Sequence, residues 1–475
     1  MKSSAQTGSL EATLQKRLAR RESQGRLRQL DVPRSDLVDF SSNDYLSLSQ
    51  DLVLRNALVA HLTNSDKESS SSSLNRRIIG SGGSRLLDGN SVFVEQVERK
   101  ISKFHGSEAA LLFTSAYDAN VGLISCVPGP GDVIMYDNLI HASIHDGMRL
   151  SRATRKIPFA HSSIIRATRR SGVEGDSEVF AAATAPRGLE LALKQLTDSD
   201  QQVRSGVSNV FICVEALYSM DGDIADLEYV SSVVKELLPR GNGHIIVDEA
   251  HSVGVLGDGG RGLTCQLGLE DRVWARVFGF GKAMGCAGGA ILCSSIARLY
   301  LINYARTLIY TTAMSFPSLA SISAAYDYMI SGGADKRRKQ LYTLIQHCHK
   351  ELGSLEQRLK PAAAVLHLPA YPSGSPIIPI FTRYPKSLAR HCQLSGFMIR
   401  PIVAPTVPQG QERIRICLHA SNTNEQVDEL CRAIGAWLSQ LRTGRDIEAT
   451  NLNKTDVTVE ADMRESPLEN MKARL

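Results

Sequence analysis

The sequence has few aromatic residues, no block of basic residues across the middle of the chain and no long apolar run. Aromatic side chains make up 6% of the 475 residues, and the net charge is +5. Nucleic-acid binding usually requires clustered basic residues, so the charge pattern gives it no support. No apolar stretch reaches the roughly 18 to 20 residues that span a bilayer, so we expect no transmembrane helix.

Paired cysteines are missing as well. The chain has nine cysteines, an odd number, and none of them forms a Cys-x-x-Cys pair. Most, such as Cys213 and Cys293, lie inside apolar runs. This usage predicts small buried side chains in a reducing compartment rather than disulfides or a metal site.

The two ends of the chain carry different signals. The N-terminus lacks the apolar core of a secretory signal, and Glu11 and Glu22 argue against interpreting the Arg-rich stretch Arg17–Arg28 as a mitochondrial leader. The last three residues, Ala473-Arg474-Leu475, form a small–basic–leucine tripeptide of the kind that a peroxisomal import receptor binds. A polar tail precedes this tripeptide and would leave it exposed. We therefore expect a peroxisomal location, with the cytosol as the alternative.

Between residues 108 and 295, short apolar runs rich in β-branched residues alternate with helix-length segments. The strands expected there are Leu111–Thr114, Val133–Tyr136, Val210–Glu215, His244–Val247, Val277–Phe280 and Gly289–Cys293. This alternation predicts an α/β fold with a mostly parallel sheet and helices on both faces. Such sheets bind ligands at the carboxyl ends of their strands.

A smaller C-terminal α+β unit is expected after a helical region around Leu319–Lys350. Its expected strands are Ile377–Phe381 and Arg413–Leu418, and an amphipathic helix follows, with Thr423 and Gln426 as its capping box. We predict four regions: an N-terminal arm at 1–50, a large domain at 51–330, a small domain at 331–445 and a polar tail at 446–475. The serine-rich stretch Ser65–Arg77 and the stretch Ser171–Arg187 are expected to be surface insertions.

Lys282 is the first candidate for a catalytic or cofactor-binding residue. It directly follows an expected strand and is flanked by Gly281 and Gly285, where backbone can approach a ligand closely. A solvated loop lysine is the alternative. A P-loop is excluded because Ala283 replaces the required Ser or Thr and Arg276 stands where the first glycine belongs.

Asp248 is the second candidate, and its position suggests that it acts together with Lys282. This carboxylate ends an apolar strand, and His251 follows three residues later. A helix cap or a turn residue is the alternative for Asp248. A lysine together with a strand-end aspartate is the pair that pyridoxal 5′-phosphate (PLP) requires, because the lysine carries the cofactor and the carboxylate keeps the pyridine nitrogen protonated. His251 would then hydrogen-bond the phenolic oxygen of the ring or orient Asp248.

Several segments resemble one family in the expected order. They are Ser41-Ser42-Asn43-Asp44-Tyr45-Leu46, Gly80-Ser81-Gly82-Gly83-Ser84-Arg85, Ser219-Met220-Asp221-Gly222-Asp223, Asp248-Glu249-Ala250-His251-Ser252-Val253-Gly254, Gly281-Lys282-Ala283-Met284-Gly285 and Pro405-Thr406-Val407-Pro408-Gln409-Gly410. From about residue 14 to residue 441 the chain resembles the α-oxoamine synthase family of fold-type I PLP enzymes. The resemblance implies an aspartate aminotransferase-like fold, with a large, mostly parallel-sheet domain and a smaller C-terminal α+β domain.

The resemblance also implies a complete site. His141 would stack on the cofactor ring, Ser219 would lie near the ring oxygen, and Arg415 would bind the carboxylate of the amino acid. The remaining positions implied are Ser115, Ala116 and Tyr117 at the phosphate, Thr311 and Thr312 reaching the phosphate from the other subunit of a homodimer, and Asn43 and Arg28 at the substrate. Each has a plainer alternative as a loop, turn or surface residue. Gly279 departs from the family, which usually has a phosphate-binding threonine there, and Ala116 replaces a common glycine.

The reaction implied is a condensation of an amino acid with an acyl-CoA, with loss of CoA and CO2. Within the family, the segments resemble most the branch that joins L-alanine to pimeloyl-CoA in biotin biosynthesis. The alternatives are an enzyme like 2-amino-3-ketobutyrate CoA ligase, an enzyme for longer acyl chains, and a non-catalytic partner subunit. Such subunits typically lack the lysine, so Lys282 argues against the last alternative, while Gly279 keeps it open.

Overall fold

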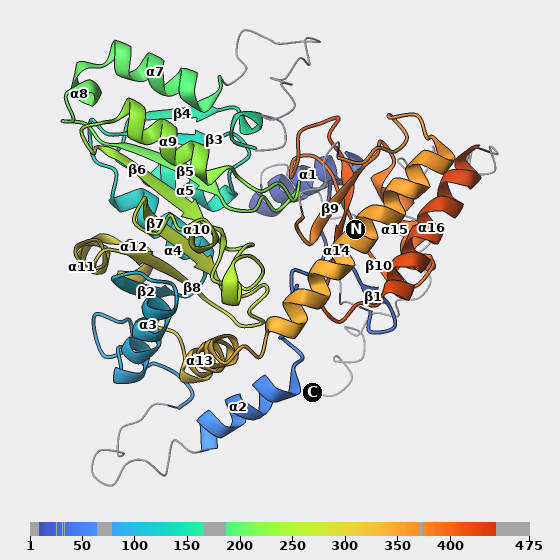
Figure 1. The fold of residues 1–475 in the computed structure, drawn as a ribbon, viewed down its shortest axis with the longest axis horizontal. Coiled ribbons are helices and arrows are strands. Elements are labelled where there is room, and N and C mark those ends of the chain that lie inside the picture. Colours follow the sequence, from blue (N-terminus) through green and yellow to red (C-terminus); the bar gives the residue numbers. More distant parts are fainter. Residues whose placement is uncertain are drawn as a thin grey trace, which may run out of the picture.

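A seven-stranded sheet forms the centre of the molecule in the computed structural model (Figure 1). The structure describes residues 9–24, 26–30, 32, 34–63, 78–165, 187–369 and 374–442. The strand order is β2-β8-β7-β6-β5-β3-β4, and β8 alone runs antiparallel to its neighbours. The strands are β2 (Ala109–Phe113), β3 (Val133–Asp137), β4 (Arg155–Phe159), β5 (Val210–Glu215), β6 (Gly243–Asp248), β7 (Val273–Gly279) and β8 (Gly289–Cys293). The predicted α/β fold with a mostly parallel sheet is confirmed.

Helices cover both faces of this sheet because its strands are apolar on both sides. In β5, Phe211 and Cys213 face a cluster with α4 and α5, whereas Ile212 and Val214 face a cluster with α7 and α9. The helices of the large unit are α2 (Leu52–Thr63), α3 (Val92–Phe104), α4 (Ala116–Cys126), α5 (Ala142–Leu150), α7 (Leu189–Ser199), α8 (Gln201–Arg204), α9 (Leu227–Leu237), α10 (Leu263–Gln266), α11 (Ser295–Tyr304), α12 (Arg306–Ile309) and α13 (Phe316–Ile330), with 3₁₀ turns η3 (His161–Ile164) and η4 (Asp258–Gly260).

The C-terminal unit is a three-stranded antiparallel sheet, ordered β11-β12-β9, covered by helices. Its elements are α14 (Asp335–Leu359), β9 (Ile377–Phe381), α15 (Pro385–Leu394), β10 (Phe397–Met398), β11 (Arg400–Ile402), β12 (Arg413–Cys417) and α16 (Asn424–Arg442). The predicted capping box of α16 is confirmed, since the amide of Gln426 donates to Thr423 Oγ1 at 3.2 Å and the amide of Thr423 donates to Gln426 Oε1 at 3.1 Å.

The helical region expected around Leu319–Lys350 consists of two helices. α13 ends at Ile330 and α14 begins at Asp335. Gly332, between them, has a φ of +76°, a backbone conformation that glycine adopts without strain. The chain can therefore turn there from the large unit into the C-terminal unit.

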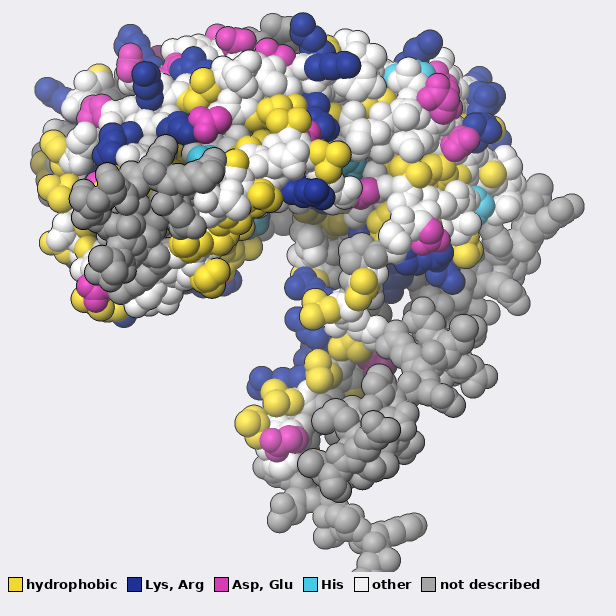
Figure 2. Space-filling view, turned by 90° about the horizontal axis from the view of Figure 1, so that it is seen from below, with side chains coloured by type: hydrophobic (Ala, Val, Ile, Leu, Met, Phe, Trp, Pro, Cys, Tyr) yellow, Lys and Arg dark blue, Asp and Glu magenta, His cyan; other side chains and the backbone are white. Residues whose placement is uncertain are grey.

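The N-terminal segment joins the C-terminal unit rather than the large sheet. β1 (Val38–Asp39) pairs in parallel with β10, and the amide of Cys417 donates to the carbonyl of Phe40 at 2.8 Å. Upstream, α1 (Leu10–Ser23) has no buried residue, and it projects as an arm from the body of the molecule (Figure 2). The boundaries predicted at residues 50, 330 and 445 stay predictions. Among the described residues, no helix is both long and apolar enough to cross a membrane.

All nine cysteines are free thiols, as the sequence predicts. Six of them are buried, and burial raises the pKa of thiols such as Cys213 to about 12. They therefore act as small apolar side chains at neutral pH. The insertions expected at Ser65–Arg77 and Ser171–Arg187 and the tail from residue 446 lie outside the described residues, apart from Arg187.

Candidate active site

Lys282 and Asp248 lie together at one edge of the central sheet. Asp248 is the last residue of β6, and Lys282 follows the neighbouring strand β7, which runs parallel to β6. Burial lowers the pKa of Lys282, while the carboxylates of Asp248 and Glu215 act in the opposite direction. The two predicted groups are thus close enough to interact electrostatically. A lowered pKa leaves more of the lysine as a neutral amine, the form that acts as nucleophile or base.

Asn120 holds Asp248 in place, and sequence reasoning missed it. This residue is buried in the middle of α4, and its Nδ2 donates to Asp248 Oδ2 at 2.7 Å and to Ser143 Oγ at 3.0 Å. The amide of Ala250 donates to the other carboxylate oxygen of Asp248 at 2.9 Å. With two donors and an exposed fraction of only 6%, Asp248 is fixed as a buried acceptor at the strand end.

Glu215 is a second buried carboxyl beside Asp248 that the sequence did not reveal. It ends β5 and is the register partner of Asp248 in β6. Burial, together with the charge of Asp248, raises its pKa well above the usual range of a glutamate, and Lys282 opposes this shift. This shift favours the neutral, protonated form of Glu215.

His141 lies at the N-terminus of α5, close to the same charges. Its Nδ1 is 2.8 Å from Ser143 Oγ and accepts from the amide of Ser143 at 3.2 Å. Burial lowers its pKa; Lys282 acts in the same direction and Asp248 against it. The ring of Tyr117 approaches His141 edge to face, with centroids 6.4 Å apart. The structure thus brings His141 close to Lys282 and Asp248, with Tyr117 beside it.

A chain of hydrogen bonds joins His251 to Arg415. His251 Nδ1 lies 2.8 Å from the hydroxyl of Tyr45, which donates to Asn43 Oδ1 at 3.2 Å. Arg415 Nη2 donates to the same Asn43 oxygen at 3.2 Å. Burial lowers the pKa of His251 well below its usual range, so its ring is neutral. The predicted residues His251, Asn43 and Arg415 therefore form one network through Tyr45. Tyr45 lies in one of the motifs identified in the sequence, but no function was predicted for it.

Ser219 lies in the turn between β5 and α9 and meets the C-terminal unit there. Its carbonyl accepts from Arg415 Nη1 at 2.9 Å. Two residues earlier in β12, the buried Arg413 forms an ion pair with Asp221 and donates to the carbonyl of Met220 at 3.2 Å. β12 thus holds the guanidinium of Arg415 against the turn that carries Ser219.

A cavity of about 600 Å³ opens beside this turn. It is lined by the loop after β3, by Ser219 and its neighbours, by residues 404–409, and by Arg26 from the segment after α1. Arg28, the arginine that the sequence suggested, is exposed two residues further on. The cavity is large enough for part of an extended substrate and lies next to Ser219.

The N-terminus of α4 packs against the end of β7. Ser115 caps the helix, with its Oγ accepting from the amide of Asp118 at 3.0 Å. A Cβ added to Gly279 would lie 3.3 Å from the Cβ of Ala116 and 3.0 Å from the Cβ of Ala250. Gly279 and Ala116, where the chain departs from the family pattern, are therefore neighbours in space. The helix N-terminus, with its positive dipole end, is suited to an anion such as a phosphate.

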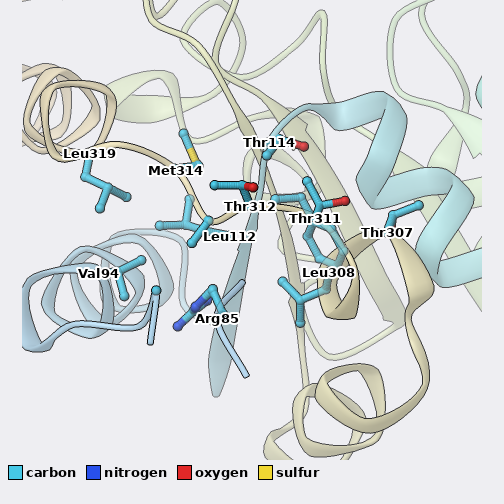
Figure 3. A pocket seen from close by; sticks show the side chains of 13 residues that line it. Arg85, Val94, Leu112, Thr114, Thr307, Leu308, Thr311, Thr312, Met314 and Leu319 are labelled. Carbon is cyan, nitrogen blue, oxygen red and sulfur yellow. The ribbon is translucent and has the colours of Figure 1, made fainter. Parts of the chain in front are cut away.

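Thr311 and Thr312 line a different pocket, shown in Figure 3 with Arg85 and Thr114. The residues that line this pocket do not include Lys282, Asp248, His251 or His141. The glycine-rich loop lies against this segment, since the carbonyl of Gly83 accepts from the amide of Ala313 at 2.9 Å. Within one chain, the structure does not bring these two threonines to Lys282, so their predicted role requires a second subunit.

The residues around Lys282 fit PLP. The amine of Lys282 can bind an aldehyde, Asp248 is a fixed acceptor for the proton of a ring nitrogen, and His141 is an aromatic ring beside both. The N-terminus of α4, at Ser115 and Ala116, would supply backbone N–H groups for the phosphate. The donor set thus matches each part of the cofactor.

Comparison with known proteins agrees with this chemistry. The family model for aminotransferase class I and II matches residues 35–434. An 8-amino-7-oxononanoate synthase of Emericella nidulans is 44% identical over 432 residues, which covers 91% of this chain and 97% of that protein. The aminoacyl transferase sphA of Aspergillus fumigatus is 37% identical over 86% of this chain and 82% of its own length.

Solved structures of the same fold include serine palmitoyltransferase from S. paucimobilis, with a TM-score of 0.72 and 20% identity over 92% of this chain and all of that one. The 8-amino-7-oxononanoate synthase of Francisella tularensis has a TM-score of 0.62 and 24% identity over 86% of this chain and all of that one. The predicted fold class is thereby confirmed. The chain belongs to the aminotransferase class I and II family and is a PLP-dependent acyltransferase, an α-oxoamine synthase.

Proposed function

We propose that this enzyme condenses L-alanine with pimeloyl-CoA to give 8-amino-7-oxononanoate, CoA and CO2, a step of biotin biosynthesis. The observation that carries the proposal is the 44% identity to the Emericella nidulans synthase over nearly the whole of both chains. The cavity beside Ser219 supports it, because an acyl chain requires room next to the amino-acid site.

When bound, PLP supplies an electron-withdrawing ring that stabilises negative charge on the α-carbon of the amino acid. Asp248, fixed by Asn120, would hold the proton on the ring nitrogen that this withdrawal requires. Lys282 would hold the cofactor, and burial lowers the pKa of Lys282, which favours its neutral amine form. It can therefore take the α-proton.

Arg415 binds and orients the carboxylate of the amino acid. Its guanidinium is already directed by the carbonyl of Ser219 and by Asn43, which reduces the entropy lost on binding. The carboxylate then fixes which bond of the α-carbon is weakened. His141 would cover the cofactor ring, while burial lowers the pKa of His251 and keeps its ring neutral beside Tyr45.

The substrates are tested by measuring CoA release with single amino acids and single acyl-CoAs. The proposal expects the highest kcat/KM with L-alanine and pimeloyl-CoA. A preference for glycine over alanine, or for palmitoyl-CoA over pimeloyl-CoA, would overturn it.

A second candidate is condensation with a longer acyl chain. The 37% identity to sphA and the shared fold of serine palmitoyltransferase favour it, since those proteins are related acyltransferases of other substrates. Serine with palmitoyl-CoA as the best pair in the same assay would select it. An enzyme like 2-amino-3-ketobutyrate CoA ligase would prefer glycine and acetyl-CoA.

We also propose a homodimer with shared active sites. Thr311 and Thr312 lie apart from Lys282 in their own chain, so a second copy must bring them to a phosphate. Leu10, Leu14 and Leu18 recur on one face of the projecting helix α1 and are exposed by 67%, 46% and 53%. Such an apolar face suits packing against a partner chain.

For location, we propose import into peroxisomes through Ala473-Arg474-Leu475, which lies outside the described residues. Fatty-acid oxidation there could supply a medium-chain acyl-CoA. Deleting the tripeptide from a fluorescent fusion should move the signal from puncta to the cytosol. Puncta that persist after the deletion would contradict the proposal.

A further inference from the structure

His161 lies between two carboxylates from different segments of the chain. Its Nδ1 is 2.9 Å from Asp137 Oδ2, and its Nε2 is 3.3 Å from Asp223 Oδ2. The ring of Tyr218 covers it edge to face, with centroids 4.4 Å apart. With only 12% of its side chain exposed, His161 uses both ring nitrogens within the protein.

Asp137 connects His161 to the segment that carries His141. It is the fully buried last residue of β3, and its Oδ1 accepts from the amide of Leu139 at 2.7 Å. The amide of His161 donates to the side chain of Asn138 at 2.9 Å. These contacts fix the four-residue turn from β3 to His141 at the start of α5.

Asp223 connects His161 to the segment that carries Ser219. The carbonyl of Asp223 accepts from the amide of Tyr218 at 2.9 Å, which closes the turn of residues 218–223. Ser219 lies within this turn, and its carbonyl accepts from Arg415. A displacement of Asp223 would therefore move Ser219 and the guanidinium that contacts it.

The charge on His161 holds these two segments together. Burial opposes protonation, but the hydrogen bonds and charges of Asp137 and Asp223 outweigh it and raise the pKa of His161 to about 10. The ring therefore carries a positive charge at neutral pH and donates to both carboxylates. The other titratable group facing it is Tyr218, whose pKa is raised well above its usual range by burial and by Asp137, so it stays neutral.

We propose that His161 is a positioning residue that sets the spacing between the segments carrying His141 and Ser219, and thereby shapes the cofactor site without touching the cofactor. The proposal rests on the proposed roles of His141 and Ser219. It assigns a function to a residue outside all of the motifs identified in the sequence. The three groups come from three separate segments: the end of β3, the 3₁₀ turn η3 after β4, and the turn between β5 and α9.

The test is the dissociation constant of PLP, measured by diluting the holoenzyme and following its visible absorption. This readout needs neither an amino acid nor an acyl-CoA, so it stands even if the proposed substrates are wrong. In His161→Gln, which loses the charge, PLP should bind about tenfold more weakly or worse, as for a lost charged hydrogen bond. The matched control is His367→Gln, an exposed histidine of the C-terminal unit, which should bind PLP like the parent protein.

The pH profile separates positioning from a merely structural role. The parent protein should lose PLP affinity as the pH rises through about 10, where His161 loses its proton, and His161→Gln should lack this component. Titration of Lys282 and Tyr218 is common to both proteins. A folded His161→Gln variant with a PLP dissociation constant within about twofold of the parent value would overturn the proposal, since a lost charged hydrogen bond costs more.

Asp223→Asn keeps the test decisive if His161→Gln does not fold. The side chain of Asp223 is 31% exposed, and its loss leaves the pair of His161 with Asp137 intact. PLP affinity should fall by about threefold or more, because a weaker hydrogen bond remains. Unchanged affinity in this variant would contradict the proposal.

Discussion

Asn120 donates a 2.7 Å hydrogen bond from the middle of α4 to the carboxylate of Asp248 at the end of β6. Helix α4 therefore contributes to the site twice: its N-terminus faces the end of β7, and its second turn orients the acid expected at the cofactor nitrogen. The sheet and this helix would thus support both the phosphate and the ring nitrogen of a bound cofactor.

Asn120→Ala should weaken PLP binding by about tenfold or more, because a buried hydrogen bond to a charged group contributes about 1.5–3 kcal/mol. The cofactor dissociation constant, followed by visible absorption, measures the effect. Asn303→Ala, which removes an exposed amide hydrogen-bonded within α11, is the matched control. Equal PLP affinity in the two variants would show that Asn120 does not support Asp248.

Gly279 and Ala116 should behave as a coupled pair. Gly279→Thr places a Cβ 3.0 Å from Ala250 and 3.3 Å from Ala116, and such overpacking typically costs about 1–3 kcal/mol. The added Ala116→Gly change removes one of the two close contacts, so the loss in Tm should be smaller in the double variant than the sum of the single losses. Additive losses would mean that the two positions do not share this space.

The stability of the protein should depend on the charge of His161. The pKa of His161 is raised to about 10 in the folded state, above its ordinary value of 6.5. Its contribution is therefore fully present below pH 6.5 and is lost as the pH rises through about 10. Between pH 7 and pH 10.5, the Tm of the parent protein should fall more steeply than that of His161→Gln. Parallel curves would contradict this assignment of charge.

Much of the fold could be predicted from the sequence because apolar runs and strand ends are local patterns. Asp248 ends an apolar strand, and Ser115 caps the helix that follows another; both are visible as patterns along the chain. Strand β4 was missed because Arg155, Lys156 and Pro158 interrupt its apolar pattern. It lies at the edge of the sheet, where proline and charge are tolerated.

The supporting residues of the site could not be predicted in this way. Asn120 lies inside an apolar helix. Glu215 ends an apolar strand, but no sequence motif around it distinguishes a site residue from an ordinary capping residue. Their roles arise from contacts with Asp248, which is 128 residues from Asn120 in the sequence. The position of His161 between Asp137 and Asp223 likewise depends on the packing of three strand ends.

Subunit complementation should reveal the shared active site. Lys282→Ala and the double variant Thr311→Val/Thr312→Val should each form dimers with little activity. In a mixed dimer, one site combines the intact Lys282 of one chain with the intact threonines of the other, so activity should return to a fraction of the parent value. CoA release after coexpression measures this. No recovery in verified mixed dimers would argue against threonines that act across the interface.

Every role proposed for the site residues requires that PLP binds at Lys282 beside Asp248. The purified protein should show the visible absorption of bound PLP, and Lys282→Ala should lose that band while it remains folded. Asp248→Asn should keep the cofactor on Lys282 but bind it more weakly, with a large loss of activity. A folded Lys282→Ala variant whose visible spectrum matches the parent protein would contradict the assignment.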